Sequence, residues 1–378
     1  MRISHLRGLA QPMKCDIAIK HPYGRPWFTV GDVVGGAIKL ELKKDVSITS
    51  VVVSLTGKLT LSFVPVEEEF WIDGFPDSRG IKITKKILDC HHTLNPSTYE
   101  KDHRGLEKGH LRIPFRLQFP IPPCSQFYAP PSLDMREDDL RATVTYSVRV
   151  EVSTASKVRS KLVEKHAILF RPPNHVVLHR PLSIPTTSIC AMLAADSLNP
   201  GVTPPYEAPY LPQYCPALQV DLTLPSPTVL QLGQPVPMEL DITVTEDLMS
   251  CLGCIRLRRL HISLTAATSV QSGPASRATE STTTICSING DFSLISGGKR
   301  GTCRIDSNLW RDRGVPEVPI SFSSSNVARS YTMNVVVGFS SGKRDNIECV
   351  AMTSPVNIWC RSDLPPEYSS DGYILQND

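Results

Sequence analysis

The stretch Leu111-Arg112-Ile113-Pro114-Phe115-Arg116-Leu117-Gln118-Phe119 decides the fold. Apolar and other side chains alternate at every step, so an extended chain places all the apolar ones on one face. This alternation is typical of an antiparallel strand with one buried face and one face in water. We therefore predict a half-buried strand here.

The same period of two recurs at residues 38–43, 144–152, 218–224 and 236–244. Within residues 255–262 the alternation slips by one position, as a β-bulge requires. No segment carries a convincing 3.6-residue period over more than a few turns. The polar, interrupted segments 73–109 and 269–304 predict long loops that contain short strands. The fold class is predicted to be all-β, built from sandwiches.

The chain also contains two similar halves. Gly31 and Gly233 are 202 positions apart, and each is followed by apolar residues in the same register. Prolines are dense between the halves, which disfavours both helix and central strand. We predict a β-sandwich at 13–172, a proline-rich extended connector at 173–216, a second sandwich at 217–361 and a short, disordered C-terminal tail at 362–378. The matching pairs are Val34 with Val236, Ile38 with Leu240, Leu40 with Ile242, and Leu42 with Val244.

The composition of the chain limits the classes of function that it can have. The 378 residues suffice for two cores, and a formal charge of +3 is too small to indicate a nucleic-acid partner. No apolar run has the length of a membrane span, and the first residues lack the apolar core of a signal peptide. Eleven cysteines without a framework spacing are typical of reduced thiols. We expect a soluble cytoplasmic protein.

Signals for a metal site or an enzyme are weak. Cys90-His91-His92, with His103 and His110, is the best metal candidate, but adjacent histidines point in different directions and the spacing fits no standard zinc site. Cys251 and Cys254 have a CxxC spacing without a second pair. No nucleophile elbow, P-loop or zincin motif occurs, and Glu67-Glu68-Glu69 is more typical of a solvated run than of paired catalytic carboxyls. We predict no metal, no cofactor and no catalysis.

One motif near the C-terminus points to a binding partner. In Pro365-Pro366-Glu367-Tyr368 the two prolines favour polyproline II, which docks on an aromatic groove with little loss of entropy. Pro365, Pro366 and Tyr368 together form the PPxY pattern that WW domains bind. Phosphorylation at the adjacent Ser369 or Ser370 would add negative charge beside this contact.

Leu211, Pro212 and Tyr214 form a degenerate version of the same motif within the predicted connector. Two weak linked contacts can strengthen binding through effective concentration. An ordinary connector turn is the alternative interpretation.

Residues 141–180 are unusually basic. If this stretch is extended, Lys157, Arg159 and Lys161 project from one face, with Lys165 nearby. This basic stripe is a candidate site for an acidic cargo motif or an anionic membrane surface, and its lysines are candidate ubiquitin acceptors. The alternative is a solvated sheet edge that its charges protect from pairing.

Several stretches together resemble a known family. Residues 28–36, Phe-Thr-Val-Gly-Asp-Val-Val-Gly-Gly, and 51–58, Val-Val-Val-Ser-Leu-Thr-Gly-Lys, resemble the opening of the arrestin N-domain, where the second strand ends in a leucine-x-glycine turn. Residues 109–115 with the prolines that follow, and 142–150, resemble later strands of that domain. With the tail motif, the chain resembles the α-arrestins. The resemblance covers 13–172, and 217–360 by general pattern.

The resemblance implies two arrestin-type immunoglobulin-like sandwiches in tandem, and a function. Members of this family are non-catalytic adaptors that link membrane transporters or receptors to WW-domain HECT-type ubiquitin ligases for ubiquitination, endocytosis and sorting, at the plasma membrane and endosomes. This chain departs from the family by having one clear motif in a short tail. A retromer-like coat subunit, and a ligand-binding or enzymatic β-sandwich, remain the alternative functions.

Overall fold

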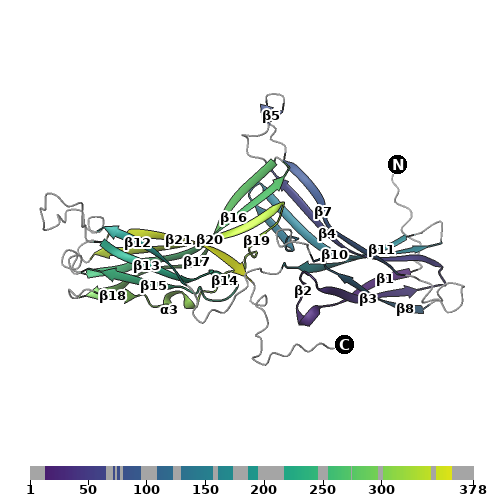
Figure 1. Cartoon of the computed structure of the whole chain (residues 1–378), viewed down its shortest axis with the longest axis horizontal. Helices are drawn as coiled ribbons and strands as arrows, with labels where there is room; N and C mark the ends of the chain where they lie inside the picture. The colour runs from purple at the N-terminus through teal and green to yellow at the C-terminus, as the bar shows by residue number, and fades with distance from the viewer. Residues whose placement is uncertain are drawn as a thin grey trace. The chain divides into compact units, whose positions relative to one another are not determined.

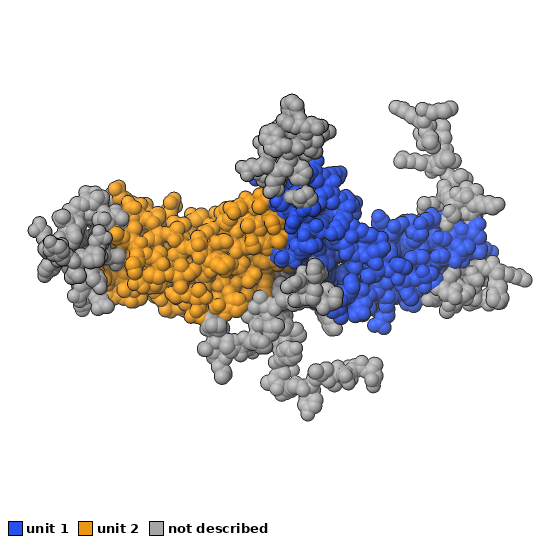
Figure 2. Space-filling view, turned by 45° about the horizontal axis from the view of Figure 1, so that its top comes forward, with its two compact units in different colours: residues 1–173, 270–277, 322–327 blue, residues 174–269, 278–321, 328–378 orange. Residues whose placement is uncertain are grey.

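The computed structural model describes residues 13–64, 71–72, 75–76, 80–94, 109–121, 129–155, 161–172, 186–194, 217–245, 254–273, 275–296, 301–341 and 346–359. These residues form strands almost throughout; the helical turns described are η1 (Pro22–Gly24) and α3 (Asn308–Arg311). The chain divides into two compact units, coloured separately in Figure 2. The all-β prediction is confirmed.

Unit 1 contains a three-stranded sheet in the order β1-β3-β8 and a six-stranded sheet in the order β2-β11-β10-β4-β7, with β9 paired to β10 (Figure 1). A separate hairpin pairs β5 (Trp71–Ile72) with β6 (Phe75–Pro76). The other strands are β1 (Met13–Lys20), β2 (Trp27–Phe28), β3 (Val33–Leu42), β4 (Ile48–Phe63), β7 (Ile81–Leu94), β8 (Gly109–Gln118), β9 (Leu133–Glu137), β10 (Leu140–Thr154) and β11 (Lys161–Phe170).

The core of unit 1 follows from the period of two. In β8, Ile113, Phe115 and Leu117 are buried, whereas the residues between them are exposed, as predicted. Full burial of such a side chain contributes about 1.5–3 kcal/mol. Phe119, just past this strand, stacks on Phe170 with ring centroids 4.6 Å apart and meets Tyr146 edge-on. The predicted strand thus supplies one wall of the core.

Unit 1 is built from three pieces of the chain, because residues 270–277 and 322–327 belong to it as well as residues 1–173. Val270, Ala275 and Val327 are members of its buried cluster. The sequence prediction placed these residues with the second sandwich, and the structure corrects it here. Their local pattern carries no signal of which core they enter.

Unit 2 repeats this architecture. One sheet has the order β12-β13-β15-β18 and the other β14-β21-β20-β16-β17, with β19 paired to β20. Its strands are β12 (Thr186–Ala194), β13 (Ala217–Pro225), β14 (Val229–Gln231), β15 (Glu239–Val244), β16 (Cys254–Ser272), β17 (Ala275–Ser296), β18 (Gly301–Arg304), β19 (Phe322–Ser323), β20 (Val327–Ser341) and β21 (Glu348–Trp359). The boundary between the units cuts through some of these strands. Unit 1 includes the last residues of β16, the first residues of β17 and β20, and all of β19.

Three sequence predictions need correction. β12 lies inside the predicted connector 173–216 and pairs with β13 along its whole length, because the window between Pro185 and Pro200 has no proline. The segments 73–109 and 269–304, for which the sequence predicts long loops with short strands, contain the 14-residue β7 and the 22-residue β17. β4 runs straight through Gly57, so no leucine-x-glycine turn ends that strand.

The predicted internal repeat is supported by hydrogen bonds. The N–H of Gly31 donates to the carbonyl of Phe119 at 3.2 Å, and that of Gly233 donates to Val315 at 2.8 Å. In each unit a short strand, β2 or β14, then pairs in parallel with the end of β11 or β21. The two units are therefore copies of one module.

Candidate binding surfaces

The outer face of the sheet β1-β3-β8 carries charged side chains that line up across the three strands. Cross-strand register aligns Asp16 with Lys39 and Arg112 in one row. Lys14, Glu41 and His110 form the next row, in which Lys14 and Glu41 make an exposed 3.7 Å ion pair. This charged face is defined by Lys14, Asp16, Lys20, Lys39, Glu41, His110, Arg112 and Arg116.

Lys and Arg outnumber carboxylates on the charged face, and its two aligned rows line a hollow of about 430 Å³. Exposed charges attract an oppositely charged peptide through summed weak interactions that salt screens. Cys15 also lines the hollow, but burial, followed by the nearby charge of Glu164, raises the pKa of Cys15 to about 12, so it stays a thiol. The face is suited to binding an acidic segment, not to nucleophilic chemistry.

The predicted basic stripe is only partly described. Lys157 and Arg159 lie outside the described residues. Lys161, at the start of β11, forms an ion pair with Glu151, whose other oxygen is 3.2 Å from an Arg149 nitrogen. Lys165 is exposed and lies opposite Arg149 in the register.

Both candidate WW-binding motifs lie outside the described residues. These are Pro365, Pro366 and Tyr368, and the degenerate Leu211, Pro212 and Tyr214. His103, Cys251 and the run 67–69 also lie outside them.

The histidines considered for a metal are spread over two strands. His91 and His92 are successive exposed residues of β7, so they point to opposite faces, while His110 lies on β8. Burial raises the pKa of Cys90, which disfavours the thiolate that a metal needs. Within the described ranges, no three His, Cys, Asp or Glu residues lie together as a metal site would require.

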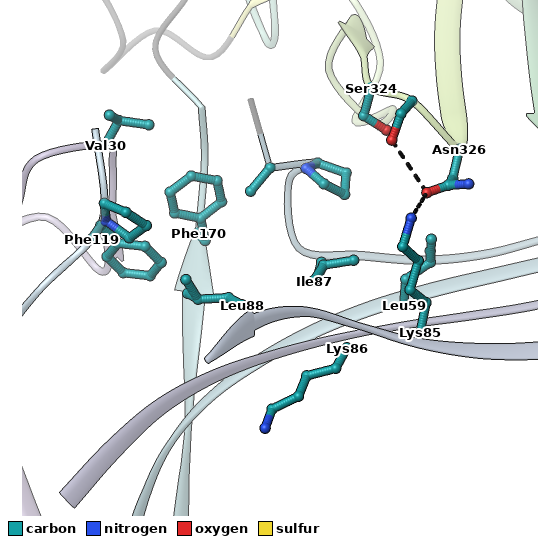
Figure 3. Close-up of a pocket in the computed structure, with 14 residues that line it drawn as sticks. Val30, Leu59, Lys85, Lys86, Ile87, Leu88, Phe119, Phe170, Ser324 and Asn326 are labelled. Atoms are coloured by element: carbon teal, nitrogen blue, oxygen red, sulfur yellow. Dashed lines mark hydrogen bonds between the residues drawn. The ribbon is translucent and has the colours of Figure 1, made fainter. Parts of the chain in front are cut away.

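A second cavity of unit 1, of about 280 Å³, was not signalled by the sequence (Figure 3). Phe119, Phe170 and Leu59 supply apolar walls. At its rim, Lys85 Nζ donates to Asn326 Oδ1 at 3.0 Å, and Asn326 Nδ2 donates to the Gln271 carbonyl at 3.1 Å. Its lining residues are spread along the chain from Val30 to Asn326, so no local pattern predicts it.

Comparison with known families identifies the N-terminal region. Residues 15–171 match the family described as Arrestin (or S-antigen), N-terminal domain. The comparison with curated protein sequences returned no match. In the parts of the chain that the structure describes, no helix has the length and apolar character to span a bilayer. The match covers most of unit 1 and less than half of the chain; it supports an arrestin-like protein and suggests an adaptor-type scaffold.

Proposed function

We propose that the protein is a non-catalytic, α-arrestin-type adaptor that links membrane transporters or receptors to a WW-domain HECT-type ubiquitin ligase. The observation that carries the proposal is the combination of an arrestin N-terminal match at 15–171 with Pro-Pro-Glu-Tyr at 365–368. Neither surface performs chemistry. Holding cargo and ligase on one chain raises the concentration of the ligase at cargo lysines.

The cargo end of the adaptor is assigned to the charged face of unit 1. A cytoplasmic tail with an acidic run would meet Lys39, Arg112 and Arg116, which project from adjacent strands. Such contacts steer association and are sensitive to salt. The protein would act in the cytoplasm, at the plasma membrane and endosomes, where such tails are presented.

We also propose that lysines of the basic stripe accept ubiquitin on the adaptor itself. The amine of Lys165 is exposed, whereas the amine of Lys161 is held by Glu151. Lys165 is therefore the better acceptor of the two. After reconstituted ubiquitination, mass spectrometry should find more diglycine remnant on Lys165 than on Lys161; the reverse ratio would remove this assignment.

The ligase end is tested by titrating WW domains with the full chain. The double substitution Pro366→Ala with Tyr368→Ala should reduce affinity at least about tenfold, because both anchors of the ligand are lost. Tyr373→Ala changes a tail tyrosine outside the motif and serves as the control. Equal binding by wild type and the double variant would exclude ligase recruitment through this motif and leave the coat-subunit function in its place.

The cargo end is tested with a synthetic peptide that carries an acidic run. Lys39→Glu with Arg112→Glu should weaken its binding and flatten the salt dependence. Lys58→Glu with Lys82→Glu makes the same charge change on exposed positions of β4 and β7, outside the charged face. If both pairs weaken binding equally, net charge and not the charged face is responsible.

A further inference from the structure

Unit 2 contains a largely apolar cavity of about 460 Å³ beside the start of β15, which we call the proline pocket. This volume is within the range of sites that bind small ligands or peptide side chains. Trp310, on α3, lines its base and is itself buried, with 2% of its surface exposed, and Arg311 follows it. The full lining is Thr186, Thr223, Leu224, Pro225, Pro235, Val236, Pro237, Met238, Glu239, Ser307, Trp310 and Arg311.

The proline pocket exists because two prolines interrupt the sheet. Unit 1 has Val33 and Gly35 at the positions that are Pro235 and Pro237 in unit 2, and there β3 pairs with β1 as far as Gly35. In unit 2, β15 begins only at Glu239, so its ladder with β13 ends at Thr223. Proline has no N–H to donate to a ladder. The gap in the sheet is therefore a property of this sequence.

The described chain ends next to this gap. The carbonyl of Trp359, the last described residue, accepts a 2.9 Å hydrogen bond from the N–H of Leu232. Pro235 is three residues further on, so it lies at most about 10 Å from Leu232. Leu364 is five positions after Trp359, which allows a reach of about 17 Å. The tail can therefore enter the proline pocket without any change in the fold.

The tail also has suitable chemistry. Leu364, Pro365, Pro366 and Tyr368 are apolar or aromatic, and apolar side chains favour a cavity that is lined mostly by apolar groups. Asp363, Glu367 and Asp371 make this segment acidic. At the pocket, Arg311 is exposed, and the exposed Arg313 lies two residues beyond it, whereas the carboxylate of the lining, Glu239, is paired with Arg304 at 3.1 Å. Apolar contacts and charge complementarity thus favour the same occupant.

We propose that residues 364–368 dock in the proline pocket of their own chain and mask the Pro-Pro-x-Tyr motif from WW domains. The consequence for ligase binding rests on the proposed function, whereas the docking itself does not. Intramolecular attachment makes even a weak contact effective. The apparent affinity for a WW domain is then reduced by the fraction of undocked tail.

The docking is tested first without any WW domain. A photo-crosslinking amino acid replaces Ser369 in the full chain at low micromolar concentration. Intramolecular crosslinks should map to residues 235–239 or 307–313. Crosslinks elsewhere in the chain, or none, would overturn the proposal.

Masking is then tested by comparing WW binding to a peptide of residues 360–378 and to the full chain. The peptide should bind about tenfold more tightly. Pro237→Glu with Arg311→Glu, both exposed in the proline pocket, should raise the affinity of the full chain to that of the peptide. Met192→Glu with Arg259→Glu makes the same charge change at exposed positions outside the pocket and should leave affinity unchanged.

The outcomes separate the two proposals. If the free peptide does not bind WW domains, the proposed function fails, and the crosslinks still decide the docking. If the peptide and the full chain bind equally well, the masking fails and the proposed function stands.

Discussion

Gly31 and Gly233 hold the same left-handed backbone conformation at equivalent turns of the two units, with φ of 80° and 71°. Each donates its N–H to a carbonyl of a distant segment, and the residue after each accepts a hydrogen bond in return, Asp32 from Phe119 and Gln234 from Val315. Glycine is required at both turns because a Cβ disfavours this conformation. The turn sets the start of the strand that follows.

Gly233→Ala should destabilise unit 2 by about 1–2 kcal/mol, measured by urea unfolding with hydrogen exchange of unit 2 peptides. The cost comes from the backbone alone, because an added Cβ meets no atom within 4 Å. Gly301→Ala is the control: it also has open space, but its φ lies outside the left-handed region. If both substitutions have the same effect, backbone strain is not the cause.

Gly57→Ala should destabilise unit 1 by about 1–3 kcal/mol for a different reason, overpacking. A Cβ at Gly57 would lie 2.7 Å from a ring carbon of Tyr146 and 2.9 Å from Leu88 Cβ. At Gly35, in the same unit, the nearest atom would be 3.9 Å away, so Gly35→Ala should be nearly neutral. Thermal unfolding of the two variants provides the comparison, and a larger loss at Gly35 would contradict it.

Tyr146→Phe should cost about 1–2 kcal/mol, because it leaves the Pro130 carbonyl without the 2.7 Å hydrogen bond that the buried phenol donates. Tyr331→Phe should cost more, since the Tyr331 hydroxyl donates to Pro319 and also accepts from the buried Arg329. Urea unfolding of both variants measures the difference. A smaller loss for Tyr331→Phe would show that the contact with Arg329 adds nothing.

The same phenol predicts a loss of stability in alkali. Burial raises the pKa of Tyr146 above the value of about 10 expected in the unfolded chain. The folded state therefore keeps its proton where the unfolded state loses it, so the contribution is complete below about pH 10 and declines as pH rises further. The free energy of unfolding should fall less between about pH 8 and about pH 10.5 for Tyr146→Phe than for wild type. If it falls equally for both proteins, groups other than Tyr146 cause the alkaline loss.

Asp32→Asn should destabilise unit 1 by about 1–2 kcal/mol. The Asp32 carboxylate accepts from Arg25 at 2.9 Å and from the Thr29 N–H at 2.8 Å, and its side chain is 13% exposed. Glu41→Gln is the control, because its ion pair with Lys14 is exposed and contributes less than about 1 kcal/mol. Equal losses in urea unfolding would indicate that burial does not strengthen the Asp32 pair.

Much of the fold was predictable because strand alternation is a local signal. Residues such as Ile113 and Phe115 report which face is buried, whatever their partner strand. The long strand β17 was missed, since its run of Ser and Thr lacks an apolar face over several residues. β12 was missed because the prolines on both sides dominated the composition of the segment.

The candidate sites also differ in whether the sequence alone reveals them. The Pro-Pro-x-Tyr motif is contiguous, so it is visible in the chain, whereas the charged face joins residues of three strands through register. Lys39 and Arg112 are 73 positions apart and become neighbours only when β3 pairs with β8. No spacing rule in the chain predicts that pairing.

The sequence by itself determined the strand class, the repeated module and the tail motif, because each depends on residues that are close along the chain. Only the tertiary structure decided that residues 270–277 and 322–327 complete the core of unit 1, and that Pro235 and Pro237 open a pocket in unit 2. The core of unit 1 and the pocket of unit 2 depend on which strands pair across long separations in the sequence. The free energy that stabilises such pairing comes from apolar surface that distant segments bury together.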